Sequence, residues 1–405
     1  MFTRLGAVAL AGVVTMSLAA PVAQAGQKVK PDFFGIHSFA AKPGVESGAM
    51  RLNCLPLWSQ VETSKGNYDW TVFDSVVDQA ESWQSGQLMY SFCGTPEWAG
   101  KPVKLPEREV QGKGATSAPA KMSYFEDYAT AVVKRYKGRI SQYQTWNEIT
   151  TPQFYQGTPG QMAKMTKILK EVVKEHDPKA KVLSASVQTH IPVYYRDMAK
   201  PYFKKLKKKY KWPIDVMTGH FYPAGKGGPN QRVKAIEMFN ADLKSLKMPK
   251  RVKKWDTEAN FYTDPNTAKT TANGRVLGNK AAMFLSRNYL DTLRTGLKRS
   301  YWYMWTIGDQ DLSFPGVQLR DDLPATAAWK TLYGWIKGAK YMGCKTEGKL
   351  VRCTFKKGGK SFEIAFTTKG KKSVQTNGKE VSSVYGKDPK AGKKTTVKKM
   401  PVKIG

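Results

Sequence analysis

The chain has 405 residues, 41% hydrophobic and 12% aromatic, which is too much apolar mass for a disordered protein. Its 66 Lys and Arg outnumber its 32 Asp and Glu, and the resulting formal charge of +34 favours an anionic partner or surface. Four cysteines are too few for a disulfide-built scaffold, and after the N-terminus no apolar run approaches the ~20 residues that span a bilayer. We therefore expect a soluble, basic, globular protein with no transmembrane segment.

Residues 1–25 have the features of a secretory signal peptide. Arg4 supplies a positive start, residues 5–20 are small and apolar, and Ala23-Gln24-Ala25 matches a small-x-small cleavage pattern. Cleavage predicts a secreted protein, extracellular or associated with the cell wall, in an oxidising setting. The alternative is an uncleaved membrane anchor, for which no second anchoring signal follows.

Eight short segments rich in β-branched or aromatic residues follow in chain order. They predict strands at residues 33–37, 49–52, 87–92, 140–146, 182–187, 214–221, 252–258 and 300–306. Helical periodicity between them marks residues 72–83, 124–136, 161–175 and 280–297. This alternation predicts an α/β fold, a (β/α)8 TIM barrel over residues 26–338. The first gap is short for a crossover helix; the alternative is an open doubly wound sheet, although no GxGxxG follows the first strand.

The chain changes character near Gly338. From Lys356 to the C-terminus, 14 Lys and no Arg stand against three acidic residues. Residues 349–355 and 361–366 alternate as strands on either side of a Gly-Gly turn. They predict a small, Lys-rich, antiparallel β-sandwich-like domain over residues 339–405. The lysine run at residues 204–209 is interpreted as a solvated helix face, so no nucleic-acid partner is expected.

The four cysteines allow three pairings. Cys54 and Cys93 follow the second and third predicted strands at the same ends of neighbouring strands, which favours a bond between them. Cys344 and Cys353 flank the first hairpin of the C-terminal domain and are expected to form the second bond. If Cys54 and Cys93 are not paired, they are small buried residues.

Two glutamates end predicted barrel strands. Glu148 closes the fourth strand and Glu258 the seventh, at the barrel face where active sites of this fold lie. These strands lie on opposite sides of an eight-stranded barrel, so the two side chains are expected to face each other. Cleavage of a glycosidic bond needs such a pair, and a separation of about 5–5.5 Å lets one carboxylate attack the sugar with retention of configuration. The two carboxyls then need different surroundings, because one must be neutral and the other ionised.

An ordered series of short motifs extends from residue 33 to residue 338. It comprises residues 34–37 (FGIH), 50–52 (MRL), 58 and 61–62 (W, VE), 66–70 (GNYDW), 94–99 (GTPEWA), 146–148 (WNE), 220–222 (HFY), 256–258 (DTE) and 301–305 (YWYMW). In this order and spacing the chain resembles clan A of the glycoside hydrolases, and most of all secreted bacterial enzymes near family 39. The resemblance implies a retaining O-glycosyl hydrolase (EC 3.2.1.-) that acts on a β-linked glycan or glycoside and uses no cofactor.

The resemblance also implies roles for individual residues. Glu148 is implied as the general acid/base and Glu258 as the nucleophile. Asn147 is expected to hydrogen-bond the sugar 2-hydroxyl, a contact that strengthens in the transition state. Arg51 and Tyr222 are expected to donate to Glu258 and keep it ionised.

Imidazole and aromatic side chains complete the predicted site. His220 is expected near the acid/base, and Trp305 under the sugar ring as an apolar platform. Trp302 is the alternative platform, because in a regular strand it faces the other way. Four further side chains are left open between a substrate contact and a packing role: His37, Trp98, Phe154 and Tyr155.

Other chemistries find little support in the sequence. The four histidines show no HExxH or paired metal spacing, and neither GxSxG nor a P-loop occurs, so no metal and no cofactor are expected. The alternative function is a non-catalytic barrel that binds carbohydrate or a cell-wall polyanion. In either case the Lys-rich C-terminal domain is a candidate contact for an anionic cell-wall polymer, and an acidic polysaccharide substrate also suits the charge.

Overall fold

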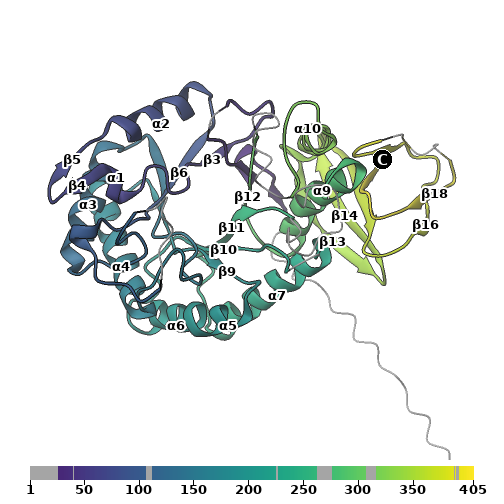
Figure 1. Cartoon of the computed structure of the whole chain (residues 1–405). Coiled ribbons are helices and arrows are strands. Elements are labelled where there is room, and N and C mark those ends of the chain that lie inside the picture. Colours follow the sequence, from purple (N-terminus) through teal and green to yellow (C-terminus); the bar gives the residue numbers. More distant parts are fainter. Residues whose placement is uncertain are drawn as a thin grey trace, which may run out of the picture.

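Eight parallel strands close into a barrel in the computed structural model (Figure 1), which describes residues 26–39, 41–105, 112–224, 227–261, 276–306, 316–386, 388 and 392–405. Each strand pairs with the next along the chain, and Ser300 of the last strand pairs with Phe34 of the first, which closes the ring. The predicted TIM barrel is confirmed. Its strands are β2 (Phe34–Ile36), β3 (Ala49–Arg51), β6 (Gln87–Ser91), β7 (Ile140–Gln144), β8 (Lys181–Leu183), β10 (Val216–His220), β11 (Lys253–Ala259) and β12 (Ser300–Trp302).

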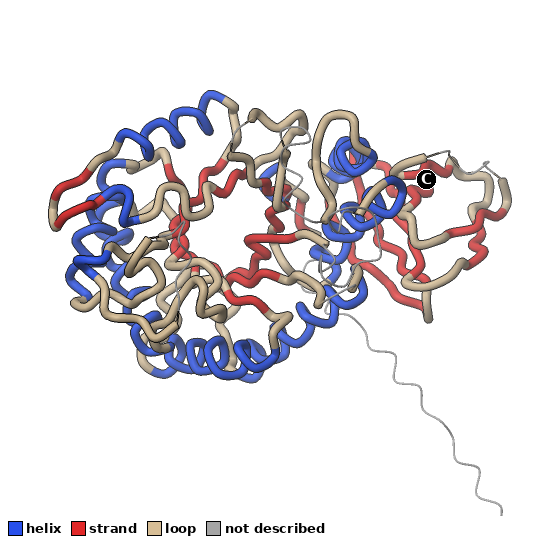
Figure 2. Tube along the Cα trace, viewed as in Figure 1, coloured by secondary structure: helices blue, strands red, loops and turns tan. Residues whose placement is uncertain are grey.

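Helices surround the strands as an outer ring (Figure 2). Each long helix buries an apolar stripe against the barrel, as Phe73, Val77 and Ala80 do in α2, because residues three to four apart share one helix face. Among the described residues between β2 and β3 there is no helix, which agrees with the short gap in the sequence. The helices are α1 (Trp58–Val61), α2 (Thr71–Ser82), α3 (Met122–Arg135), α4 (Pro159–His176), α5 (Pro192–Tyr194), α6 (Lys200–Lys208), α7 (Pro229–Ser245), α9 (Gly278–Arg294) and α10 (Pro324–Ile336).

Two local features differ from the sequence-based expectation. The predicted strand at residues 182–187 is two pieces, β8 and the short β9 (Val187–Gln188). Between them the Ser184 hydroxyl accepts the backbone N–H of Thr218 at 2.9 Å and so replaces a ladder hydrogen bond. A small hairpin of β4 (Glu62–Ser64) and β5 (Asn67–Tyr68), which the sequence did not predict, follows α1.

An apolar layer fills the inside of the barrel on the side toward the N-terminal ends of the strands. Ala49, Met89, Leu183, Val216, Trp255 and Tyr301 form one buried cluster there. Tyr301 needs the glycine opposite it, because a Cβ on Gly35 would lie 2.4 Å from the tyrosine ring. The ring is also held at its far end, where its hydroxyl donates to Gln142 at 2.8 Å.

An antiparallel β-domain packs against one side of the barrel (Figure 1). Its six-stranded sheet has the order β1-β13-β14-β15-β19-β17, and β16 pairs with β18 separately. The barrel and this domain share one hydrophobic core, and the Arg287 guanidinium of α9 lies 4.2 Å from the ring centroid of Phe366. The strands are β1 (Gln27–Lys28), β13 (Lys340–Glu347), β14 (Leu350–Lys357), β15 (Lys360–Thr367), β16 (Lys372–Gln375), β17 (Val381–Ser383), β18 (Lys394–Val397) and β19 (Val402–Ile404).

The boundary between residues 338 and 339 stays a prediction. The N-terminal strand β1 crosses it, because Gln27 pairs with Tyr341 of β13. The predicted signal peptide, residues 1–25, lies outside the described residues. In the part of the chain that is described, no helix has both the length and the apolar character needed to cross a bilayer.

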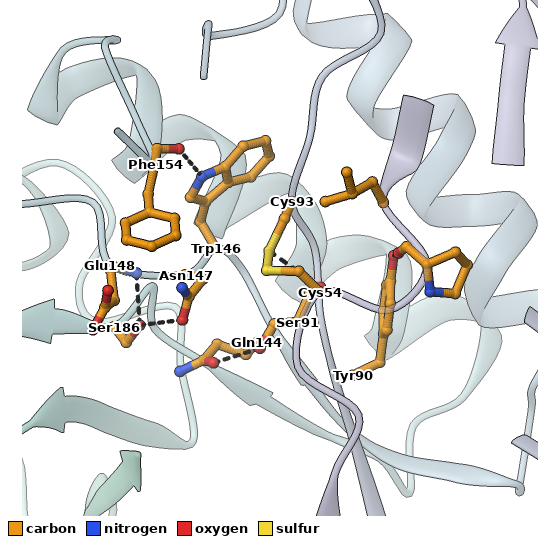
Figure 3. The surroundings of a disulfide bond; sticks show 12 residues. Cys54, Tyr90, Ser91, Cys93, Gln144, Trp146, Asn147, Glu148, Phe154 and Ser186 are labelled. Carbon is orange, nitrogen blue, oxygen red and sulfur yellow. Dashed lines mark hydrogen bonds between the residues drawn. A yellow bond between two sulfur atoms is a disulfide. The ribbon is translucent and has the colours of Figure 1, made fainter. Parts of the chain in front are cut away.

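Two disulfides join the four cysteines in the pairing that the sequence favoured. Cys54 is bonded to Cys93 in the loops after β3 and β6, beside the residues that follow β7 (Figure 3). Cys344 is bonded to Cys353, its direct partner across the β13–β14 ladder.

Replacing Gly35 tests the close packing inside the barrel. We expect Gly35→Ala to lower the free energy of unfolding by about 1–3 kcal/mol, because the new methyl group overlaps the Tyr301 ring and the hydroxyl of that ring is fixed. Urea unfolding followed by fluorescence measures the change. Gly334→Ala in α10 is the matched control, since its added Cβ meets no atom within 4 Å, and it should be neutral or stabilise by up to about 1 kcal/mol. Equal effects of the two substitutions would contradict this account.

Candidate active site

The two predicted glutamates meet at the C-terminal end of the barrel. Glu258 lies in β11, and Glu148 follows the end of β7 by four residues. One carboxylate oxygen of each lies within 4.8 Å of the other and of a ring nitrogen of His220. Both side chains are largely buried, with 4% of Glu148 and 9% of Glu258 exposed. The topology thus brings together two acids separated by more than a hundred residues.

The backbone at Glu148 is in the left-handed region, with φ of 47°. A non-glycine residue pays about 1–2 kcal/mol there, so the surrounding structure must hold it. The backbone N–H of Glu148 donates to the Ser186 hydroxyl at 2.8 Å (Figure 3), which fixes the turn after β7. This turn directs the carboxyl group toward His220.

Two donors hold Glu258, one at each carboxylate oxygen. Arg51 Nη1 donates to Oε2 at 2.9 Å, and the Tyr222 hydroxyl donates to Oε1 at 2.8 Å. Charge-assisted hydrogen bonds of this kind favour the ionised carboxylate. The contacts match those expected for Arg51 and Tyr222 from the sequence.

Arg51 is fully buried and all of its nitrogen atoms are engaged. Besides Glu258, Nη1 donates to His37 Nε2 at 3.1 Å. The rest of the guanidinium donates to the side-chain oxygens of Gln144, Ser91 and Asn147 at 2.7–3.2 Å. A buried cation is tolerated only when its donors are satisfied, and here they are. One arginine therefore orients several side chains of the site at once.

His37 holds Arg51 in place through a hydrogen bond to its guanidinium. Its Nδ1 lies 3.0 Å from the backbone oxygen of Trp302, to which it donates, so Nε2 is left as the acceptor for Arg51. Burial and the Arg51 charge hold the pKa of His37 well below its usual value. A neutral His37 thus positions Arg51, and its two hydrogen bonds, to the Trp302 backbone and to Arg51, occupy both ring nitrogens.

His220 bonds the other glutamate. Its Nδ1 lies 2.8 Å from Glu148 Oε1, and its Nε2 lies 3.0 Å from the Thr257 hydroxyl. A carboxylate accepts and does not donate, so we assign the imidazole proton to Nδ1, which donates to Glu148. The Thr257 hydroxyl, which accepts from the Gln144 amide at 3.1 Å, then donates to Nε2. Burial lowers the pKa of His220 to about 3, although Glu258 opposes the shift. His220 is therefore a neutral donor to Glu148.

Asn147 precedes Glu148 and presents its amide nitrogen to the site. Its oxygen accepts from Arg51 at 2.7 Å and from Ser186 at 3.4 Å (Figure 3). Within the described residues, no hydrogen bond uses its side-chain nitrogen. The N–H groups thus remain for a ligand.

The aromatic candidates separate into two groups. The Trp305 backbone N–H donates to the His37 oxygen at 2.9 Å, so this residue lies at the C-terminal end of the barrel. Trp302 is fully buried with its ring 6.2 Å from Phe261, so it presents no face to a ligand. Trp305 is itself only 5% exposed, and it keeps the platform role as a prediction because it lies at the end of the barrel where the glutamates are.

The remaining open candidates have mainly packing contacts. The Trp98 ring lies 5.3 Å from Tyr124, and its Nε1 donates to the Glu62 backbone oxygen at 3.0 Å. Tyr155 is buried with its ring 5.8 Å from Trp146. Phe154 is half-buried and lines a small cavity that Asn147 also lines. Only Phe154 thus lies beside a predicted sugar-binding residue.

Solved structures show where this fold occurs elsewhere. A family 39 glycoside hydrolase from the gut symbiont Bacteroides cellulosilyticus WH2 superposes with a TM-score of 0.67 at 15% identity, covering 92% of this chain and 80% of that one. A family 30 subfamily 8 xylanase from Clostridium acetobutylicum has a TM-score of 0.61 at 12% identity, covering 94% and 97%. A family 44 endoglucanase from Clostridium thermocellum has a TM-score of 0.55 at 13% identity, also covering 94% and 97%.

The chain shares the fold of the clan A glycoside hydrolases. The resemblance drawn from the motifs is confirmed at this level. At identities of 12–15%, the likeness concerns the fold alone. No protein-family model and no curated protein sequence matches the chain.

The clan A fold places several residues in the site that the sequence analysis did not single out. Gln144, Ser91, Thr257 and Ser186 connect the two glutamates through hydrogen bonds to Arg51, His220 or the Glu148 backbone. The sequence gives only a weak signal for them, because each is a single polar residue in or just after a strand that is otherwise buried. His190, after β9, was also missed; its ring lies 6.4 Å from that of Tyr222, and its buried Nδ1 has no partner among the described residues.

The two glutamates and His220 are also the one group of described residues with the spacing of a metal site. The donor set fits a divalent cation poorly. Arg51 and Tyr222 already donate to both oxygens of Glu258, and a guanidinium 2.9 Å from a ligand oxygen would repel the metal. The arrangement suits proton transfer and nucleophilic attack.

The buried histidines predict a dependence of stability on pH. In the unfolded chain a histidine has a pKa of about 6.5, whereas the pKa of His220 in the fold is about 3 and that of His37 is also well below its usual value. Below pH 6.5 the unfolded state therefore binds protons that the folded state does not. We expect acidification from pH 7 to pH 5 to lower the free energy of unfolding by about 2 kcal/mol through His220, with a further loss in the same direction through His37.

Urea unfolding at pH 5, 6 and 7 measures this slope. The substitution His220→Asn keeps a donor at the Nδ1 position but cannot titrate. The free energy of unfolding of this variant should therefore depend less steeply on pH than that of the wild type, because the contribution of His220 is gone. Identical slopes in the two proteins would show that the fold does not lower the pKa of His220 and would contradict this account.

Proposed function

We propose that the protein is a retaining glycoside hydrolase with Glu148 as acid/base and Glu258 as nucleophile. The observation that carries the proposal is the approach of the two carboxylates to within 4.8 Å at the C-terminal end of the barrel. Retaining enzymes hold their carboxyl groups about 5–5.5 Å apart, whereas inverting enzymes need about 6.5–9.5 Å to admit a water molecule. The short separation favours direct attack on the sugar.

The different partners of the two acids support different roles. Glu258, held by Arg51 and Tyr222, attacks the anomeric carbon while Glu148 gives its proton to the departing oxygen; the glycosidic bond breaks and a glycosyl ester forms. Glu148, now a carboxylate, then takes a proton from water, the water oxygen attacks the same carbon, and the ester breaks. The His220 N–H holds Glu148 Oε1 and orients the carboxyl group through both steps.

Three side chains are proposed to bind the sugar. The free N–H groups of Asn147 are suited to the 2-hydroxyl, because Arg51 holds the amide oxygen. Trp305 is proposed as the platform beneath the ring. His190 supplies a further polar atom near Tyr222 and Glu148, and its buried Nδ1 without a described partner is suited to a sugar hydroxyl.

We propose a β-linked poly- or oligosaccharide as the substrate and a secreted enzyme, extracellular or associated with the cell wall. The xylanase and endoglucanase among the structural neighbours support a polysaccharide. Two disulfides are typical of an oxidising compartment, and a conserved exported protein from Bacteroides fragilis shares the fold with a TM-score of 0.59. The signal-like residues 1–25 point the same way.

Isosteric substitution of each glutamate tests the assignment. We expect Glu148→Gln and Glu258→Gln to lower kcat/KM by about three orders of magnitude or more, because each removes a proton donor or a nucleophile without changing the packing. The measurement is release of an aryl leaving group from a panel of chromogenic β-glycosides and of reducing ends from plant, fungal and bacterial polysaccharides.

The matched control is Glu97→Gln, the same change at a side chain that is 72% exposed. It should retain wild-type turnover. Azide should separate the two roles on an activated aryl glycoside when each glutamate is shortened to alanine, which makes room for the anion. Glu258→Ala should give a glycosyl azide of inverted configuration, because azide replaces the missing nucleophile, and Glu148→Ala one of retained configuration, because azide attacks the glycosyl ester without a base. If the wild type hydrolyses none of these substrates at several pH values, a non-catalytic carbohydrate-binding barrel would be favoured instead.

A second proposed role is retention on an anionic cell-wall polymer through the β-domain. A groove of about 960 Å³ lies between α9 and this domain, with Tyr385 and Met283 in its lining. Four lysines also line it, and among the described residues none of them forms an ion pair: Lys280, Lys371, Lys398 and Lys399. A positively charged groove of this size suits a polyanion strand.

Charge removal in the groove tests this role. We expect Lys371→Gln/Lys398→Gln/Lys399→Gln to weaken binding to immobilised polygalacturonate by at least about tenfold while turnover is unchanged. The matched control, Lys204→Gln/Lys205→Gln/Lys208→Gln, removes the same charge from the outer face of α6. Equal losses of binding in the groove variant and the α6 variant would show that retention depends on net charge and not on the groove. Substitution is preferred to truncation after residue 337, because truncation would expose the shared core.

A further inference from the structure

A cationic cavity lies at the opposite end of the barrel from the two glutamates. Its volume is about 390 Å³, and it is bounded by β1 and by the residues that begin β8, β11 and β12. The proposed catalytic residues lie where strands end, so this cavity opens on the other face. Six cationic side chains line it: Lys28, Lys30, Lys181, Lys253, Lys298 and Arg299.

The positive charge in the cavity has little compensation. Among the described residues that line the cavity, Asp32 is the one with a carboxylate, and its Oδ2 accepts a hydrogen bond from Arg299. Asp215 lies near Lys181, but Lys170 binds both of its oxygens at 2.7 and 2.8 Å. In the described ranges, none of the five lysines that line the cavity forms an ion pair. Crowded cations without a counter-ion raise the free energy of the fold.

The rigid floor of the cavity contrasts with its lysine rim. The Arg299 guanidinium lies 4.1 Å from the Trp255 ring centroid and donates to Gln87, Gln142 and Tyr301 at 2.8–3.0 Å. Arg299 is therefore fixed and contributes its field. At the rim, Lys298 donates one hydrogen bond to the Gln27 side chain and Lys253 one to the Lys250 backbone oxygen at 3.1 Å, so both ammonium groups keep further N–H donors for a ligand. Preorganisation of this kind reduces the entropy that binding must overcome.

The titration of the lysines agrees with this geometry. Burial, together with the neighbouring Lys253 and Lys254, lowers the pKa of Lys298 to about 8. Burial and the Arg299 charge lower that of Lys181. A fold that maintains such mutual repulsion in a cavity has a candidate functional site there.

We propose that this cavity binds a ligand that carries two or more closely spaced oxyanion groups, either phosphates or carboxylates. A single monoanion would neutralise only one of the five lysines, and the cavity is larger than one oxyanion. The site is independent of glycoside hydrolysis, because it lies on the opposite barrel face from Glu148 and Glu258. Occupation would hold an anionic polymer or metabolite at the base of the barrel and leave the mouth open.

Calorimetric titration of the full chain with two probes, tripolyphosphate and trigalacturonate, tests the proposal. We expect saturable binding of at least one probe, and the tighter one identifies the ligand as phosphate- or carboxylate-bearing. Lys181→Gln/Lys253→Gln/Lys298→Gln should weaken that binding at least tenfold, since each lost charge-assisted hydrogen bond is worth about a factor of ten. The α6 variant described above, with the same loss of charge, should bind within about twofold of the wild type.

Two outcomes would overturn the proposal: no saturable binding of either probe by the wild type, or equal weakening in the cavity variant and the α6 variant. Folding of the cavity variant is checked by its unfolding midpoint, which should equal or exceed that of the wild type because repulsion is relieved. Hydrolysis by the cavity variant should be unchanged, so failure of this site and failure of the proposed catalytic function are distinguishable.

Discussion

The ion pair between Arg51 and Glu258 is the contact on which the site depends. A buried guanidinium is costly unless every donor is used, and breaking such a pair from one side typically costs about 3–5 kcal/mol. Arg51 satisfies its donors with side chains that follow β2 or lie on or just after β6, β7 and β11. Closing the barrel and assembling the site are consequently one event, because these groups meet only when the strands are in register.

Stacked layers along the barrel axis separate two charged regions. The polar network around Arg51 occupies the upper layer, the apolar cluster that includes Met89, Leu183 and Val216 lies beneath it, and Arg299 with its amide partners lies at the base. Tyr301 connects the two lower layers, because its ring is in the apolar cluster and its hydroxyl bonds Gln142. The apolar layer keeps the positive base of the barrel away from the neutral histidines and the carboxylates at its mouth.

Much of this arrangement could be predicted from the sequence, because the eight barrel strands, the four helices named from their periodicity and both disulfides follow from local patterns and from strand order. Glu148 and Glu258 were found because they end strands, which is a local signal. Gln144 and His190 were not, since their importance arises from hydrogen bonds and burial that only the closed barrel creates. The formal charge of +34 says how much positive charge the chain carries but not where that charge gathers in the fold. In the sequence, the dense run of lysines near the C-terminus is its most visible part. The six cationic side chains of the cavity come from four separate stretches of the sequence, residues 28–30, 181, 253 and 298–299, and only the topology brings them together.

The pairing of β1 with β13 has a consequence for how the chain reaches its final state. Gln27 is among the first described residues to be synthesised, yet its partner Tyr341 appears only after every barrel strand. This ladder has a large sequence separation, and contacts of that kind form late because the intervening loop entropy must be overcome first. A growing polypeptide therefore carries residues 27–28 without their strand partner until the C-terminal sheet exists, and their backbone stays open to proteases or a chaperone in the interval.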